Sequence, residues 1–176
     1  MAERPGTAAA RAVATFGYVG LMRPGPGTWG SAVALLLGWA LHALGGPLLL
    51  AVAAGLAFAA GLGAVRLLGG GDEAAEIDRP EYVIDEAVGQ WIALLPVSLG
   101  AQGAGVPLAA LWPGLLTAFV AFRVFDILKI WPVNLVDRRH DALGVMGDDV
   151  VAGLYAALTV LVLAALFHAV LMGGAG

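Results

Sequence analysis

The sequence contains no cysteine, and only 12% of its 176 residues carry a charge. Without cysteine the chain forms no disulfide, no thiolate metal site and no cysteine nucleophile. The net charge of −4 and the pI near 5.2 argue against a nucleic-acid-binding protein, which would carry a clustered basic surface. Hydrophobic residues, in contrast, make up 60% of the chain, and the mean hydropathy is +0.89. This composition predicts an integral membrane protein with a single domain, residues 1–176.

The charged residues are gathered in three blocks, at residues 3–23, 66–86 and 123–149. Two charge-free stretches separate the blocks. A Gly45-Gly46-Pro47 break interrupts the first stretch, and the Gly-rich segment 101–107 interrupts the second. Such breaks favour tight turns, so each stretch is expected to form a helical hairpin. The residues after the third block form one more apolar run, which is long enough for a single crossing of the bilayer.

These features predict an all-α, polytopic helical bundle of two hairpins and a C-terminal span, with its charged loops on one face. Because all nine basic residues lie in the three blocks, the positive-inside rule places that face in the cytoplasm. The N-terminal residues show no signal-peptide pattern and are expected in the mature protein. The expected spans cover roughly residues 30–44, 47–66, 87–101, 106–124 and 150–172.

The stretch MRPGPGTWGS, residues 22–31, is an irregular turn rich in glycine and proline that leads into an apolar run. In one interpretation, the backbone N–H groups around Gly27 bind a phosphate group, and Arg23 adds positive charge. In the other, Thr28 and Ser31 only cap the start of a helix at the membrane surface. The turn by itself favours the capped helix, because Gly-rich turns are common.

The stretch EYVIDEAVGQW, residues 81–91, places Asp85 and Glu86 where a polar segment becomes an apolar helix. Two adjacent carboxylates at this point are suited to hold a divalent cation. Acidic residues are also common in the first turn of a helix, where the helix dipole stabilises them. The two interpretations remain equally open from this stretch alone. Gly89, four residues after Asp85, leaves room on that face for another chain segment or a ligand.

The third charged block begins with Arg123, Asp126 and Lys129, which recur every three residues. A helix that leaves the membrane at this point would carry the three side chains near one face. The simpler explanation is an ion-paired helix at the surface.

Asp148 and Asp149 stand at the expected head of the last span, after a polar loop at residues 137–141. One aspartate there would be an ordinary N-cap, but capping does not explain two. Carboxylates at a membrane surface with Arg and Lys nearby suit a Mg²⁺-dependent reaction on a phosphate headgroup. The cation would neutralise phosphoryl oxygens and activate water, and the basic groups would hold the remaining charge.

Three motifs in this order resemble the phosphatidylglycerophosphatase A family: PGPGTWGS, IDEAVGQW, and FRVFDILKIWP followed by DRRHDALGVMGDDVVAG. Together they span residues 24–153. The resemblance implies a Mg²⁺-dependent enzyme that removes the terminal phosphate of the phospholipid phosphatidylglycerophosphate and leaves phosphatidylglycerol. It also implies a multi-pass protein of the bacterial cytoplasmic (inner) membrane with its active site facing the cytoplasm.

The motifs and the resemblance together predict the roles of individual residues. The predicted catalytic residues are Arg123, Asp126, Lys129, Asp148 and Asp149. The predicted substrate-binding residues are Arg23, Gly27, Thr28, Ser31, Lys129, Asp137 and Arg138. The predicted metal ligands are Asp85, Glu86, Asp126, Asp148 and Asp149. The chain departs from the family at Ile130, where proline is usual, and at Asp141-Ala142, where a Gly-Gly pair is usual. Asp141 is therefore a further candidate metal ligand.

Three other classes of membrane protein fit less well. A CDP-alcohol phosphotransferase would carry a DG-x-x-A-R motif, which is missing. Lipid phosphatases of the acid-phosphatase type need catalytic histidines, but only His140 lies in a charged block. A small ion transporter would place ionisable groups within its spans. The expected spans contain only His42 and His168, which we interpret as hydrogen-bonding or interfacial residues.

Overall fold

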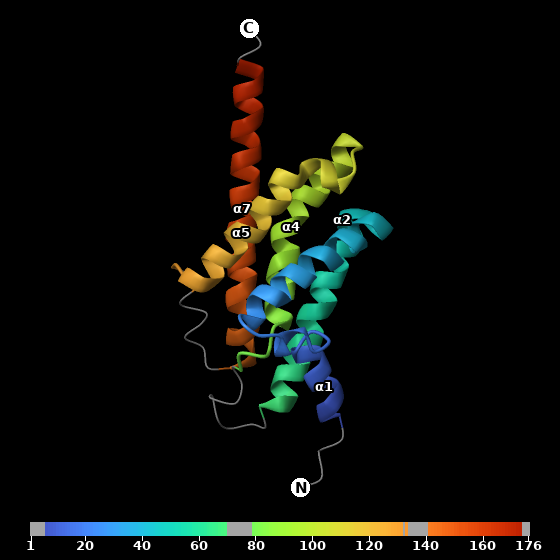
Figure 1. Ribbon diagram of the computed structural model, residues 1–176, viewed down its shortest axis with the longest axis vertical. Helices are drawn as coiled ribbons and strands as arrows, with labels where there is room; N and C mark the ends of the chain where they lie inside the picture. Colours follow the sequence, from blue (N-terminus) through green and yellow to red (C-terminus); the bar gives the residue numbers. More distant parts are fainter. Residues whose placement is uncertain (1–5, 70–78, 132, 134–140, 174–176) are drawn as a thin grey trace.

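The computed structural model describes residues 6–69, 79–131, 133 and 141–173. These residues form helices and no β-strand, which confirms the predicted all-α class. Figure 1 shows an elongated bundle with the N-terminus at one end and the last helix extending to the other. The elements are α1 (Thr7–Ala14), η1 (Val19–Leu21), α2 (Pro26–Leu68), α4 (Ile84–Ala104), η2 (Leu108–Leu111), α5 (Trp112–Leu128) and α7 (Ala142–Gly173).

Helix α2 is broken near its middle and folds back on itself (Figure 1). Gly45 and Gly46 leave the helical region, and Gly46 has a φ of 64°, which glycine adopts at little cost. Pro47 follows and has no N–H to donate to the preceding turn. The predicted break is therefore present, and α2 is a hairpin of two helices.

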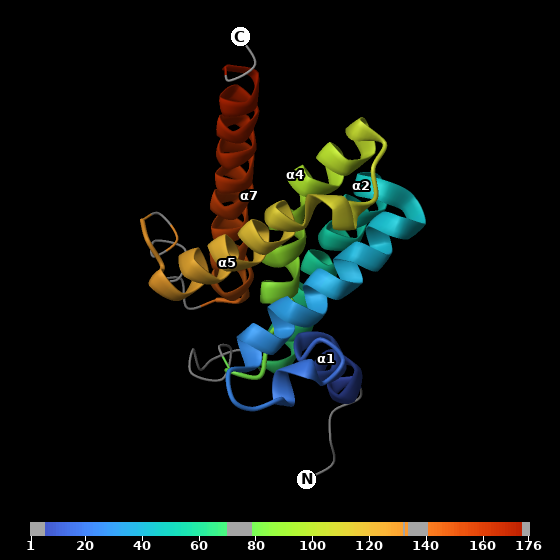
Figure 2. The same cartoon turned by 45° about the horizontal axis from the view of Figure 1, so that its top comes forward.

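Helix α4 is the central helix of the bundle and packs against α2, α5 and α7. Figures 1 and 2 both show it between α2 and α7. The helix ends at the predicted Gly-rich break, where Gly105 has a φ of 64°. A short 3-10 turn then leads into α5, which packs against α4.

Helices α4 and α7 cross at close range because each has a glycine at the crossing. A Cβ atom on Gly153 would collide with the backbone carbonyl of Gly89. A Cβ atom on Gly89 would collide with the Phe122 ring and lie 2.6 Å from the backbone oxygen of Asp149. Small residues permit such close helix contacts in a bilayer. The room predicted at Gly89 is therefore filled by α5 and α7, and the crossing brings Asp149 next to α4.

Within the described part of the chain, three helical segments are long and apolar enough to cross a membrane. They are Pro26–Leu68, which includes the break described above, Leu108–Leu128 and Ala142–Val170. Their outward side chains include the exposed Leu56, Leu116 and Leu163, as expected for surfaces in contact with lipid. The chain is thus a membrane protein by composition and helix length, and the five individual spans remain a prediction.

Candidate active site

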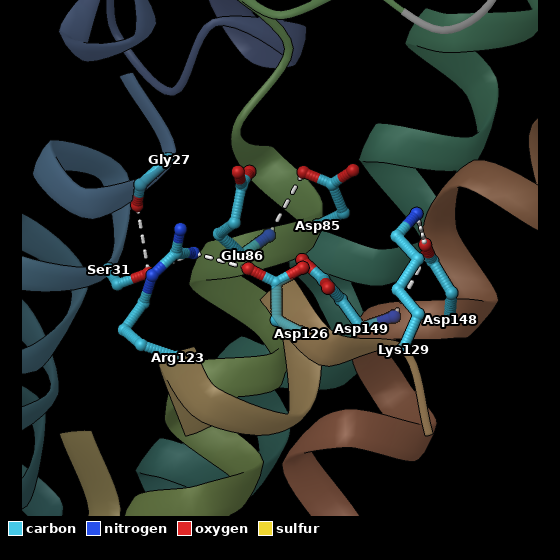
Figure 3. Close-up of polar contacts among 9 residues, drawn as sticks. All are labelled: Gly27, Ser31, Asp85, Glu86, Arg123, Asp126, Lys129, Asp148 and Asp149. Carbon is cyan, nitrogen blue, oxygen red and sulfur yellow. Dashed lines mark hydrogen bonds and ion pairs between the residues drawn. The ribbon is translucent and has the colours of Figure 1, made fainter. Parts of the chain in front are cut away.

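Carboxyl groups from two helices meet where α4 begins and α7 passes beside it (Figure 3). Asp85, Glu86 and Asp149 each offer one carboxylate oxygen, and these three atoms lie within 4.8 Å of one another. We call these three residues the carboxylate cluster. Asp85 and Asp149 are buried, with exposed fractions of 9% and 3%.

The start of α4 is held in place by α1. The backbone N–H of Val83 donates to the backbone oxygen of Ala14 at 2.9 Å, immediately before α4 begins. Asp85 and Glu86 then occupy the first turn, where the backbone N–H groups favour negative charge. The Oδ1 atom of Asp85 accepts a hydrogen bond from the backbone N–H of Glu86 at 2.9 Å. This bond orients the Asp85 carboxylate within the cluster.

The start of α7 differs from the prediction. The helix begins at Ala142, and Asp141 is its N-cap, because Asp141 Oδ1 accepts from the backbone N–H of Gly144 at 2.8 Å. Asp148 and Asp149 therefore lie in the second turn and cap nothing, contrary to the alternative considered for them. Asp141, proposed above as a further metal ligand, lies outside the carboxylate cluster and caps the N-terminus of α7.

The two adjacent aspartates face different partners. Lys129, the C-cap residue of α5, has a φ of 43° and donates from Nζ to Asp148 Oδ2 at 3.0 Å. Asp148 Oδ1 accepts from the backbone N–H of Asp149 at 3.0 Å. The side chain of Asp149 is left to join Asp85 and Glu86 (Figure 3).

Arg123 on α5 joins the cluster to α2. Its Nη1 atom pairs with Asp126 Oδ2 at 2.6 Å and donates to Ser31 Oγ at 3.3 Å. The Ser31 hydroxyl in turn donates to the backbone oxygen of Gly27 at 2.9 Å. Figure 3 shows the Asp126 carboxylate between Arg123 and Asp149. Asp126 thus lies beside the cluster, with its charge partly balanced by Arg123.

Gly27 brings α2 against the cluster. A Cβ atom at Gly27 would collide with the Glu86 carboxylate and lie 3.3 Å from Arg123 Nη1. Because α2 begins at Pro26 with Gly25 as its N-cap, neither Thr28 nor Ser31 caps the helix, and the capping interpretation is wrong for both. Of the predicted substrate-binding residues, the structure places Gly27, Ser31 and Lys129 around the carboxyl groups. Thr28 and Arg23 are exposed, and Asp137 and Arg138 lie outside the described residues.

The charges at this site do not balance. The carboxylate cluster lies beside Asp126 and Asp148, whereas the basic side chains at the site are Arg123 and Lys129 (Figure 3). Burial raises the pKa of Asp85 well above its usual range, and the charge of Glu86 adds to this effect. Burial also raises the pKa of Glu86 to about 8, with further contributions from Asp149 and Asp126. Such a group of buried carboxyls favours either bound protons or a cation.

The residues present fit a divalent metal ion. Carboxylate oxygens are the ligands that hard cations such as Mg²⁺ prefer. The buried Oε2 atom of Glu86 has no hydrogen-bond partner among the described residues, so it is available as a ligand.

The sequence analysis missed Gln90, which lies on α4 four residues after Glu86. Its side chain is fully buried, and neither Oε1 nor Nε2 has a hydrogen-bond partner among the described residues. The signal was a glutamine inside an apolar helix, on the face that carries Glu86.

Comparison with known proteins identifies the family of the chain. The family model for phosphatidylglycerophosphatase A matches residues 12–164. The chain is 35% identical over 142 residues to phosphatidylglycerophosphatase A of Haemophilus influenzae, which covers 80% of each chain. It is 35% identical over 81 residues to phosphatidylglycerophosphatase A of Escherichia coli, which covers 46% of this chain and 41% of the relative. No solved structure matches the chain. The chain belongs to the phosphatidylglycerophosphatase A family and is a phosphoric monoester hydrolase.

Proposed function

We propose that this chain hydrolyses the terminal phosphate ester of phosphatidylglycerophosphate, with Mg²⁺ as its cofactor, at the cytoplasmic face of the bacterial inner membrane. The observation that carries the proposal is the carboxylate cluster, with Arg123 and Lys129 beside it. Both relatives described above are named for this lipid phosphatase activity.

Asp85, Glu86 and Asp149 would hold the metal ion, because their oxygens already converge. Asp126 lies next to them and is the candidate fourth carboxylate ligand. When bound, Mg²⁺ neutralises phosphoryl oxygens and lowers the pKa of bound water. Asp148 pairs with Lys129, so we propose a positioning role for Asp148 in place of the metal-binding role predicted from the sequence.

Arg123 and Lys129 would bind the phosphoryl group. Each is held by an aspartate, Arg123 by Asp126 and Lys129 by Asp148, at the edge of the cluster. A cation fixed in this way stabilises charge on a phosphoryl oxygen without reorganising during the reaction. The backbone of α2 at Gly27 and the hydroxyl of Ser31 complete this side of the site.

The testing experiment measures phosphate release by the purified protein from phosphatidylglycerophosphate and from phosphatidic acid, with and without Mg²⁺. We expect release from phosphatidylglycerophosphate that requires the metal, and much less from phosphatidic acid. Glu81→Gln is a control for substitutions of the carboxylate cluster, because it neutralises an acidic residue outside the cluster. Glu81 pairs with Arg11 instead. No release from phosphatidylglycerophosphate at any Mg²⁺ concentration would refute the proposed activity.

A further inference from the structure

Gln90 is a polar side chain inside the apolar helix α4. It is completely buried within α4, yet its carbonyl oxygen and its amide nitrogen have no hydrogen-bond partner among the described residues. The Nε atom of Arg123 is likewise buried and has no acceptor in the described part of the chain. Buried polar groups are rarely left unpaired, because desolvation without a new hydrogen bond costs free energy. The two side chains together offer donors that suit an acceptor from outside the described chain.

The register of α2 and α4 places Gln90 level with Ser31. The first half of α2 and α4 run in the same direction. Gly27 contacts Glu86, and further along Trp91 Nε1 donates to the backbone oxygen of Ala34 at 2.7 Å. Ser31 is one turn beyond Gly27, and Gln90 is one turn beyond Glu86. The two therefore lie at the same depth, one turn below the carboxylate cluster.

The contacts of α5 bring Arg123 to this same level. Gly89, next to Gln90, is in contact with the ring of Phe122, next to Arg123. Arg123 Nη1 also donates to Ser31 Oγ at 3.3 Å. Since the Ser31 hydroxyl already donates to Gly27, it has no proton left for Gln90. Gln90 and Arg123 thus share one depth in the bundle, and neither the Gln90 amide nitrogen nor Arg123 Nε has an acceptor among the described residues.

We propose that Gln90 is a phosphate-binding residue, whose Nε2 amide and the Nε–H of Arg123 donate to oxygens of the substrate's phosphoryl group. This inference rests on the proposed function and adds a donor to which the sequence analysis assigned no role, although Gln90 lies within the motif IDEAVGQW. One helical turn is about 5.4 Å, so a phosphoryl group bound there stays within reach of the cluster above it. Two N–H donors aimed at phosphoryl oxygens match the charge that develops during phosphate transfer.

The test compares Gln90→Met with Ser98→Ala. Methionine keeps a long, flexible side chain and removes both polar atoms of Gln90. Ser98 is also fully buried on α4, and it makes a hydrogen bond to His42 at 2.6 Å, away from the cluster. Each variant is measured for the KM with phosphatidylglycerophosphate, for inhibition by inorganic phosphate, and for protection against thermal unfolding by inorganic phosphate with Mg²⁺.

We expect Gln90→Met to raise the KM and the inhibition constant of inorganic phosphate about tenfold, the usual loss for a hydrogen bond to a charged group. Its unfolding temperature without phosphate should not fall, because no hydrogen bond within the described chain is removed. Gln90→Glu should weaken phosphate binding further, because its carboxylate repels the anion. Ser98→Ala should leave phosphate binding unchanged.

Unchanged KM and phosphate inhibition in Gln90→Met would overturn the inference. So would a loss of stability with normal phosphate binding, which would mean that Gln90 only holds a bridging water. The thermal measurement needs no hydrolysis. If the protein does not cleave phosphatidylglycerophosphate, but phosphate protects it and Gln90→Met removes the protection, the proposed substrate is wrong and the phosphate site stands.

Discussion

Lys129 and Asp148 form an ion pair at 3.0 Å, and this pair separates the roles of two adjacent aspartates. With Asp148 turned toward Lys129, Asp149 is the aspartate of α7 that joins Asp85 and Glu86. The same substitution at the two positions should therefore have different consequences.

Asp149→Asn should lower metal affinity and turnover by about a hundredfold or more, because it removes a charged ligand from the cluster. Asp148→Asn should change the Mg²⁺ dependence much less, because Asp148 pairs with Lys129 and is not a member of the carboxylate cluster. Titrations of activity against Mg²⁺ concentration measure both effects. If the two variants had the same Mg²⁺ dependence, the division of roles would be wrong.

Gly27→Ala should reduce activity far more than it reduces the amount of folded protein. The added methyl group would meet the Glu86 carboxylate, which is the end of a flexible side chain and can move aside, but only by leaving the cluster. Gly63→Ala is the control, because a Cβ at Gly63 meets no atom within 4 Å. Activity per folded molecule, measured after size-exclusion chromatography, gives the comparison. Normal activity in Gly27→Ala would refute a role for this close approach.

The metal-free protein should become less stable as the pH rises. The pKa of Glu86 is raised from 4.5 to about 8 in the folded chain, so its stabilising contribution is present below pH 4.5 and is lost as the pH passes through 8. Mg²⁺ should then stabilise the fold more at pH 8.5 than at pH 6, because it replaces the lost protons. Thermal unfolding with Mg²⁺ and with a chelator at both pH values checks this prediction.

Glu86→Gln supplies the control for the pH experiment. Its amide does not titrate, so the metal-free protein should lose much of its pH dependence, whereas Glu81→Gln should retain it. A metal-free protein that becomes more stable between pH 6 and pH 8.5 would contradict the sign derived for Glu86.

The proposed topology can be tested with single cysteines, because the chain has none of its own. Arg79 lies on the charged face and Gly103 lies near the turn between α4 and α5, where a Cβ meets no atom within 4 Å. In spheroplasts, whose inner membrane is intact, an impermeant maleimide should label Gly103→Cys. It should label Arg79→Cys only after the membrane is opened. Labelling of both cysteines from the same side would refute the two-hairpin topology.

Local chemistry made part of the fold predictable. The turn at Gly45-Gly46 and the helix end at Gly105 follow from backbone conformations that glycine adopts easily. The predicted metal ligands came from both the second and the third block, and three of them, Asp85, Glu86 and Asp149, converge in the structure.

Helix starts and side-chain directions were harder to predict. Asp148 and Asp149 were expected at the head of the last span and Asp141 in a polar loop, whereas the helix begins at Ala142 with Asp141 as its cap. Spacing along the sequence does not reveal which of two adjacent aspartates turns toward Lys129, because that choice depends on how α5 crosses α7. Gln90 was missed for the same reason, since its significance depends on what surrounds it in three dimensions.

The glycine crossing of α4 and α7 has a mechanical consequence. The part of α7 beyond Gly153 extends about 25 Å along the axis and is exposed over residues 161–170, whereas Asp149 lies only about 6 Å from the crossing. If α7 tilts about this point to match a thicker or thinner bilayer, its far end moves several times further than the Asp149 carboxylate. A tilt of α7 about this crossing would therefore change the position of Asp149 less than that of the helix end, so we expect the spacing of the carboxyl groups to depend only weakly on membrane thickness.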